Sequence, residues 1–275
     1  MNLGELLDGK GKNRLSASVL YARDVSEVLF LDRVKSSALQ SRIAGEAATF
    51  VRQARFHAHA RIPHVDLGEI VSQLSPEPVS EIVLPGPRPF HRVGSTTYYA
   101  ALASVVRAVD PTTVLEFGTY LGMGTLTIAL NARPECRIVT VDLPDDAEVG
   151  EEHALNRADL TLIDVRRERV GEAFLGSRVA DRITQVRTDS LTWRADTAVS
   201  SVDLVLVDGG HSAPVVRADT ENAFRVLAEN GTVLWDDYFH LYPDVVGYLD
   251  GLAAGGRVMR TIRGTNVVIS DDRLR

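Results

Sequence analysis

The sequence predicts an α/β protein in which a doubly wound, mostly parallel sheet follows an N-terminal helical extension. Three observations support this fold class. Short apolar runs alternate with helical patterns from Val114 onward, as they do in sheets built of strand–helix–strand units. One run, Val202–Val207, is apolar except for Asp203, which favours a central parallel strand. Between Ala22 and Ala60, glycine and proline are scarce and apolar residues recur at helical spacing.

The elements can be placed in order along the chain. One or two helices are expected within residues 22–60, and the prolines between residues 63 and 89 then exclude a regular helix. Residues 1–79 would form the extension and its linker, and residues 80–275 the main domain. Later helices are expected at residues 95–109, 122–131, 165–175, 214–229 and 244–254. Strands are expected at residues 114–117, 137–142, 183–187, 202–207, 232–235, 257–262 and 266–269, the last two antiparallel. Residues 143–164 are polar and acidic, which favours a surface loop over the site.

Composition excludes several classes of protein. With 275 residues, 45% of them hydrophobic, the chain can bury a full α/β core. A net charge of −7 without a long basic run disfavours nucleic-acid binding. The single cysteine, Cys136, excludes a disulfide framework and a cysteine-rich zinc site. No signal peptide and no membrane-spanning apolar run is recognisable, so we expect a cytoplasmic protein without a membrane partner.

Charge is unevenly distributed along the chain. Residues 1–61 contain 10 Lys and Arg against 6 Asp and Glu, a net charge of +4, although the whole chain is acidic. A basic helical arm beside an acidic core could dock on its own core or on a second subunit, giving a homodimer through the N-terminal helices. A merely solvated helical face explains the same charges.

The stretch Val114–Gly124 is typical of a buried strand, a glycine turn and the start of a helix. Gly118 lets a ligand approach the backbone, and free N–H groups at the helix start can bind polar ligand groups. Asp142 ends the next apolar run, where its carboxylate can accept hydrogen bonds from both hydroxyl groups of a ribose. The sequence therefore predicts a nucleoside-binding site here.

The glycine spacing indicates which nucleoside cofactor is bound. The pattern Gly-x-Gly-x-x-Gly of dinucleotide sites is absent, and Glu116 before the turn suits a ligand with ammonium and sulfonium charge better than a pyrophosphate. Glu-x-Gly-x-x-x-Gly followed by a strand-end aspartate resembles the S-adenosylmethionine (SAM) site of class I methyltransferases. The residues expected to bind SAM are Glu116, Gly118, Thr119, Tyr120, Gly122, Thr125, Asp142, Leu143, Asp189, Ser190 and Asp208.

Three further acids follow two neighbouring strands. Asp208, Asp236 and Asp237 would repel one another unless a positive charge lay among them, and Mg²⁺ prefers such oxygen ligands. Alternatively, Asp208 contacts the amino group of SAM and Asp236 caps the next helix. His211 lies three residues beyond Asp208 and could take a proton from a substrate hydroxyl, or it could only pack against or cap the helix.

Longer motifs make the resemblance more specific. Leu206-Val-Asp-Gly-Gly-His-Ser, Arg217-Ala-Asp and Asn230-Gly-Thr-Val-Leu-Trp-Asp-Asp-Tyr resemble SAM-dependent methyltransferases of the macrocin/mycinamicin sugar O-methyltransferase type. The resemblance covers about residues 80 to 270. It implies a Rossmann-like sheet of seven strands, SAM as the methyl donor and, in many members, Mg²⁺. Carried across by motif, Asp208, Asp236 and Asp237 would hold the metal ion and His211 would be the base.

The resemblance implies O-methylation of a hydroxyl group on a small natural product or a sugar. Two alternatives stay open from the sequence. A metal-independent N-methyltransferase needs no ion, because an amine is already nucleophilic, and a SAM-binding subunit without catalysis needs no base. An NAD-dependent dehydrogenase is the remaining alternative.

Overall fold

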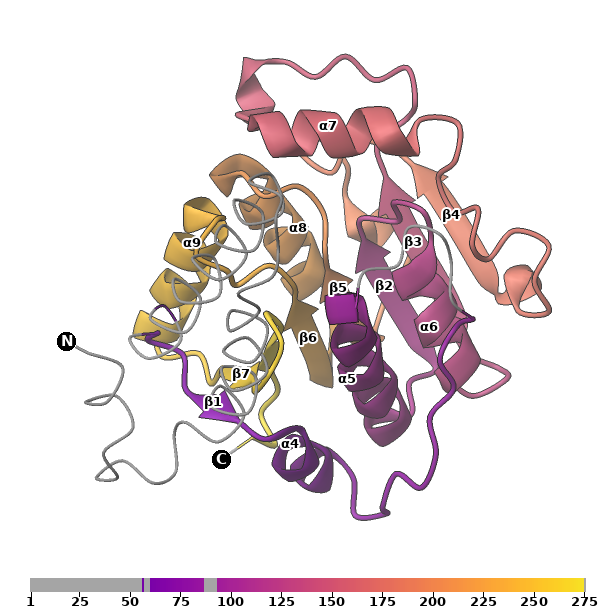
Figure 1. Cartoon of the computed structure of the whole chain (residues 1–275), viewed down its shortest axis with the longest axis vertical. Helices are drawn as coiled ribbons and strands as arrows, with labels where there is room; N and C mark the ends of the chain where they lie inside the picture. The colour runs from indigo at the N-terminus through magenta and orange to yellow at the C-terminus, as the bar shows by residue number, and fades with distance from the viewer. Residues whose placement is uncertain (1–55, 57–59, 87–92, 275) are drawn as a thin grey trace, which may run out of the picture. The chain divides into compact units, whose positions relative to one another are not determined.

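The computed structural model describes residue 56, residues 60–86 and residues 93–274 (Figure 1). The helices expected within residues 22–60, and any dimer formed through them, lie almost entirely outside the described residues. Residues 61–275 form one compact unit. This unit begins earlier than the boundary expected between residues 79 and 80, because a strand and a helix from the expected linker pack into it.

An eight-stranded sheet forms the centre of this unit, in the order β1-β7-β8-β6-β5-β2-β3-β4. Its strands are β1 His64–Val65, β2 Thr113–Phe117, β3 Arg137–Asp142, β4 Ile183–Arg187, β5 Val202–Val207, β6 Leu227–Trp235, β7 Arg260–Ile262 and β8 Val268–Ser270. All neighbours are parallel except β8, which is antiparallel to β6 and to β7. The mostly parallel Rossmann-like sheet is confirmed, and so is the antiparallel closing pair.

The expected number of seven strands is wrong by one. The additional strand, β1, comprises two residues and pairs in parallel with β7 at the edge of the sheet. A two-residue strand directly after Pro63 carries no alternating pattern, so its pairing depends on the backbone of β7 and not on a local signal.

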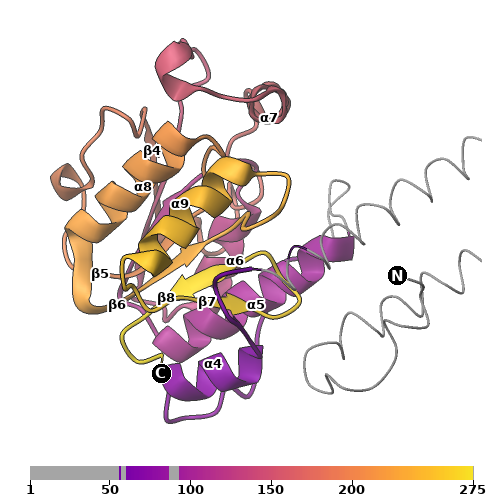
Figure 2. The same ribbon diagram turned by 90° about the vertical axis from the view of Figure 1, so that its left-hand side faces the viewer.

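Helices cover both faces of the sheet, as a doubly wound fold requires. They are α4 Leu67–Leu74, α5 Val93–Val109, α6 Met123–Asn131, α7 Arg157–Arg166, α8 Ala213–Val226 and α9 Pro243–Ala254. In Figures 1 and 2, α8 and α9 lie on one face, and α4, α5 and α6 lie on the other. No helix in the described part of the chain combines the length and the apolar content that crossing a membrane requires.

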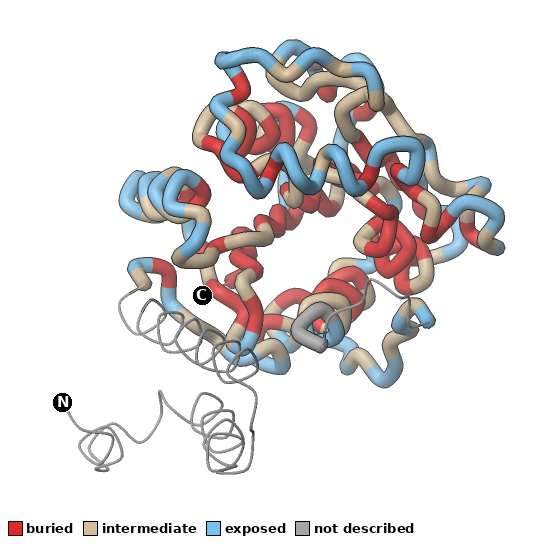
Figure 3. Tube along the Cα trace, turned by 45° about the horizontal axis from the view of Figure 1, so that its top comes forward, coloured by how far each residue is buried: buried red, intermediate tan, exposed pale blue. Residues whose placement is uncertain are grey.

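The core aligns the carboxyl ends of four central strands. Buried residues are concentrated in the strands and on the inner sides of the helices (Figure 3). Phe117 of β2 pairs with Val141 of β3 and with Val207 of β5, and Val207 pairs with Trp235 of β6. The residues that follow these positions therefore emerge side by side at one edge of the sheet.

Helix α7 is the main departure from the expected elements. It occupies residues 157–166, where a loop was expected, and residues 167–175 form turns where a helix was expected. Asn156 begins the helix, because its side-chain oxygen accepts hydrogen bonds from the N–H groups of Ala158 and Asp159. The Asp159 carboxylate accepts the N–H of Asn156 in return. This local capping prevails over the apolar spacing that favoured the later helix.

Candidate active site

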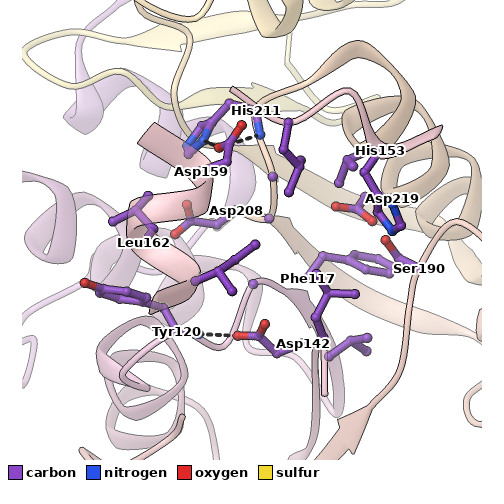
Figure 4. A pocket seen from close by; sticks show the side chains of 18 of the residues that line it. Phe117, Tyr120, Asp142, His153, Asp159, Leu162, Ser190, Asp208, His211 and Asp219 are labelled. Atoms are coloured by element: carbon purple, nitrogen blue, oxygen red, sulfur yellow. Dashed lines mark hydrogen bonds and ion pairs between the residues drawn. The ribbon is translucent and has the colours of Figure 1, made fainter. Parts of the chain in front are cut away.

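A cavity of about 350 Å³ lies at the carboxyl ends of the strands (Figure 4). It is lined by the ends of β2, β3 and β5, by the segment after β4, and by one side of α7, namely Asp159, Leu162, Ile163 and Arg166. Of the residues expected to bind SAM, the lining includes Gly118, Tyr120, Asp142, Leu143, Asp189, Ser190 and Asp208. It does not include Glu116, Thr119, Gly122 and Thr125.

Glu116 lies beneath the glycine turn, inside the fold. Its carboxylate accepts hydrogen bonds from the Thr125 hydroxyl and, at 2.6 Å, from the Thr140 hydroxyl. Burial raises the pKa of Glu116 to about 7, although both hydroxyl groups oppose this rise. A Cβ atom at Gly124 would lie 2.6 Å from Glu116 Oε1, so the helix approaches this carboxylate closely. Glu116 therefore ties α6 to β3 beneath the turn.

Gly118 allows two strand ends to meet. Its φ is +93°, and a Cβ atom there would lie 1.8 Å from the backbone oxygen of Asp208. No side chain fits at that distance, and L-residues rarely adopt that φ. The glycine is therefore required for β2 and β5 to end side by side at the cavity.

Asp142 already has two partners on the protein. Its carboxylate accepts the N–H of Tyr120 at 2.7 Å and pairs with Arg166 at 3.2 Å. Burial raises the pKa of Asp142, and Arg166 and the N–H of Tyr120 oppose that rise. Arg166 is itself buried and also pairs with Asp145 at 3.4 Å. The carboxylate expected to bind a ribose thus shares its site with an arginine that the sequence did not indicate.

A second polar group lies beyond the end of β4. Asp189 accepts the N–H of Leu191 at 2.9 Å, and its other oxygen is 3.1 Å from Nε2 of His153. Beside it, Asp219 of α8 is buried in the cavity wall. Burial raises the pKa of Asp219 to about 7, while a hydrogen bond from the Ser190 hydroxyl opposes the rise. His153 and Asp219 were not expected at the site.

The three acids expected to bind metal are brought together. Asp208, Asp236 and Asp237 each offer an oxygen within 4.8 Å of the others. Asp208 also accepts the Tyr98 hydroxyl at 2.9 Å, and the N–H of Asp237 donates to Asp236 at 2.7 Å. Burial, followed by the charges of Asp236 and Asp237, raises the pKa of Asp208 well above its usual range. Burial and the Asp237 charge raise the pKa of Asp236 to about 8.

This acid cluster (Asp208, Asp236 and Asp237) fits a hard divalent cation. Carboxylate oxygens are the ligands that Mg²⁺ prefers, and burial together with the charges of the neighbouring acids raises the pKa values of Asp208 and Asp236. The residues present therefore match the expected Mg²⁺.

His211 lies between two carboxylates. Its Nδ1 pairs with Asp159 of α7, and its Nε2 lies 2.7 Å from Oδ2 of Asp237. The ring stacks on Tyr242, with ring centroids 3.9 Å apart. Burial alone would lower the pKa of His211, but the hydrogen bonds with Asp159 and Asp237 outweigh it and raise the pKa to about 10. Asp159 was missed because it falls in the segment expected to be a loop.

The cavity thus has two chemically different ends. One end holds Asp142, Asp189, Ser190 and Asp219, and the other holds Asp208, Asp237 and His211; Asp236, the third member of the acid cluster, does not line the cavity. Phe117, Leu155 and Leu162 contribute apolar surface to the lining. A ligand with hydroxyl and amino groups can bind at the first end while an ionisable group reacts near His211.

Comparison with known proteins gives the following similarities. The structure of TomG, an O-methyltransferase from Streptomyces achromogenes involved in tomaymycin synthesis, in complex with SAM, covers 82% of this chain and 97% of its own, at 14% identity and a TM-score of 0.47. An O-methyltransferase from Bacillus cereus in complex with SAH covers 82% and 99%, at 16% identity and a TM-score of 0.46. The SAH-bound methyltransferase PaMTH1 of Podospora anserina covers 62% and 76%, at 20% identity and a TM-score of 0.44.

No curated protein matches the sequence significantly. A family model described as a methyltransferase domain matches residues 115–238. This segment includes every residue expected to bind SAM or metal, and also His211. The part of the chain that carries the candidate site is therefore similar to methyltransferase domains.

Proposed function

We propose that this protein is a SAM-dependent O-methyltransferase that uses Mg²⁺ and methylates a hydroxyl group of a small natural product or sugar. The observation that carries the proposal is the position of Asp208, Asp237 and His211 at one end of the cavity whose other end holds Asp142, Asp189 and Ser190, with Asp236 completing the acid cluster. The methyltransferase-domain match over residues 115–238 supports the donor. The resemblance to sugar O-methyltransferases supports the acceptor class.

The donor would bind at the first end of the cavity. SAM supplies an activated methyl group when bound. Asp142 would accept hydrogen bonds from its ribose hydroxyl groups beside Arg166, and Gly118 would let it approach the backbone. Asp189 and Ser190 would lie beside the adenine base of SAM. Leu155 and Leu162 would exclude water from the reacting groups, which strengthens the electrostatic interactions there.

The acceptor would bind beside the acid cluster. Asp208, Asp236 and Asp237 would hold Mg²⁺, which supplies positive charge that favours an ionised acceptor oxygen. The acceptor proton would pass to Nε2 of His211, while Asp159 holds Nδ1 and stabilises the charged ring. Because Asp237 lies 2.7 Å from Nε2, His211 can act as a base only when a cation offsets the charge of Asp237. The hydrogen bond from Tyr98 fixes the orientation of Asp208.

The first test measures binding by isothermal titration calorimetry with the full chain. We expect S-adenosylhomocysteine (SAH) to bind and NAD not to bind. If NAD binds and SAH does not, the protein would be better explained as an NAD-dependent dehydrogenase than as a methyltransferase.

The second test measures transfer of labelled methyl groups from SAM to a panel of hydroxylated compounds and to matched amines. We expect methylation of hydroxyl groups that EDTA abolishes and Mg²⁺ restores. EDTA-resistant methylation of amines would favour the metal-independent N-methyltransferase. SAH binding without turnover on any acceptor would favour a non-catalytic SAM-binding subunit.

A further inference from the structure

Asp219 of α8 is a buried acid that has no role in the methyl transfer proposed above. Its side chain lines the cavity, yet the residue is only 1% exposed. Its Oδ1 has no hydrogen-bond partner among the described residues. A Cβ atom at Gly209 would lie 2.5 Å from its Oδ2, so the carboxyl group is packed tightly against the loop after β5. An unpaired buried carboxyl oxygen is costly unless a ligand supplies a donor.

The neighbouring side chains do not supply that donor. The charges of Asp189 and Asp142 repel a negative charge at Asp219. Two basic side chains that line the cavity pair elsewhere, Arg166 with Asp142 and His153 with Asp189. The Ser190 hydroxyl bonds to the carboxyl group but leaves Oδ1 free. Oδ1 is therefore an unsatisfied acceptor in the wall of the cavity.

The surroundings indicate what kind of ligand carries the donor. In Figure 4, the Phe117 ring lies between Asp142 and the pair formed by Ser190 and Asp219. Val141 and Leu143 add apolar surface to the same part of the lining. A flat heteroaromatic ring fits against apolar side chains while its polar edge reaches an acceptor. A nucleoside with its ribose at Asp142 would place its base on this side.

We propose that Asp219 accepts a hydrogen bond from the exocyclic amino group of adenine and thereby selects adenine over its deaminated form, an inference that rests on the proposed function. In its ionised form the Asp219 carboxylate only accepts hydrogen bonds, and the single hydrogen of the Ser190 hydroxyl is already donated to it. Asp219 repels a carbonyl group at that position, and this repulsion provides the discrimination.

The test compares binding of SAH and S-inosylhomocysteine, which carries a carbonyl group in place of the adenine amino group. Both are titrated by calorimetry at pH 8, above the pKa of about 7 of Asp219, into the full chain, into Asp219→Asn and into the control Glu221→Gln. Glu221 is an exposed acid on the same helix, outside the cavity lining. We expect the unaltered chain to prefer SAH by about tenfold or more, since a site built for a donor rejects a ligand that lacks it.

Asp219→Asn can donate to the carbonyl group, so its preference should shrink or reverse, and Glu221→Gln should keep the original ratio. Equal binding of the two ligands by the unaltered chain overturns the inference without any variant. An unchanged ratio in Asp219→Asn also overturns it, and Asp219→Ser replaces that variant if it does not fold. If neither ligand binds the unaltered chain, the proposed function itself fails.

Discussion

Asp159 and His211, 52 positions apart in sequence, are joined by two hydrogen bonds. Oδ1 of Asp159 pairs with the ring Nδ1 of His211 and accepts its backbone N–H at 3.4 Å. The other oxygen, Oδ2, accepts the N–H of Asn156 at the start of α7. One carboxylate thus completes the capping of α7 that Asn156 begins and orients the imidazole, so the placement of α7 and the orientation of His211 depend on each other.

The first prediction concerns Asp159→Asn. The amide keeps an oxygen for the helix start but loses the charge that holds Nδ1–H of His211. We expect kcat for methyl transfer to fall by about tenfold or more, but by less than the full ~10²–10⁴ that a general base supplies. KM for SAM and the calorimetric Kd for SAH should change little, because Asp159 lies at the His211 end of the cavity.

The matched control for this variant is Asp164→Asn. Asp164 is on the same helix and its side chain is 78% exposed, so kcat should not change. An unaltered kcat in Asp159→Asn would show that His211 does not need this partner, and equal losses in both variants would indicate damage to α7.

The second prediction concerns the acid cluster and thermal stability at neutral pH. In EDTA, Asp236→Asn should unfold at a higher temperature than the unaltered chain, because the folded state no longer has to raise the pKa of this buried carboxyl group from its usual value to about 8. Millimolar Mg²⁺ should raise the unfolding temperature of the unaltered chain by mass action and have less effect on the variant. Scanning calorimetry in both buffers measures this. If Mg²⁺ stabilises neither protein, the cluster does not hold the ion.

The sequence predicted the parts of the fold and site that depend on local patterns. Apolar runs at β2, β3 and β5 predicted the central strands and therefore the edge where Asp142 and Asp208 emerge. Asp208, Asp236 and Asp237 could be placed together because residues that follow neighbouring parallel strands share one edge of a sheet.

The remaining features depend on tertiary contacts that carry no local pattern. α7 is short and polar, and its only sequence signal is Asn156 followed three residues later by Asp159. Because this helix was not predicted, Asp159 and Arg166 were not predicted to be part of the site. Glu116 was expected at the ligand, but its position on β2 directs its carboxylate to Thr125 and Thr140 inside the fold. β1 exists only through its pairing with β7.

The third prediction concerns Glu116 and pH. Its pKa is about 7 in the folded chain and about 4.5 when unfolded, so the folded state holds the proton to higher pH. The contribution of Glu116 to the free energy of unfolding should therefore fall as pH rises from about 4.5 to 7, by an amount of order 3 kcal/mol, and stay level above that.

Glu116→Gln cannot lose a proton, so the variant should show a smaller fall over this range, measured by urea unfolding at each pH. Glu135→Gln, an exposed acid, should behave like the unaltered chain. Parallel pH profiles for Glu116→Gln and the unaltered chain would contradict the assignment.

The fourth prediction compares two glycines. Gly118→Ala should lower the free energy of unfolding by about 3 kcal/mol or more, because φ is +93° and the added Cβ atom would lie 1.8 Å from the backbone oxygen of Asp208. Gly251→Ala, in α9 with nothing within 4 Å of the added atom, should instead stabilise the chain by roughly 0.5–1 kcal/mol. Urea unfolding of both variants measures the contrast. If Gly118→Ala were as stable as the unaltered chain, β2 and β5 could not end in the close approach that forms the cavity wall.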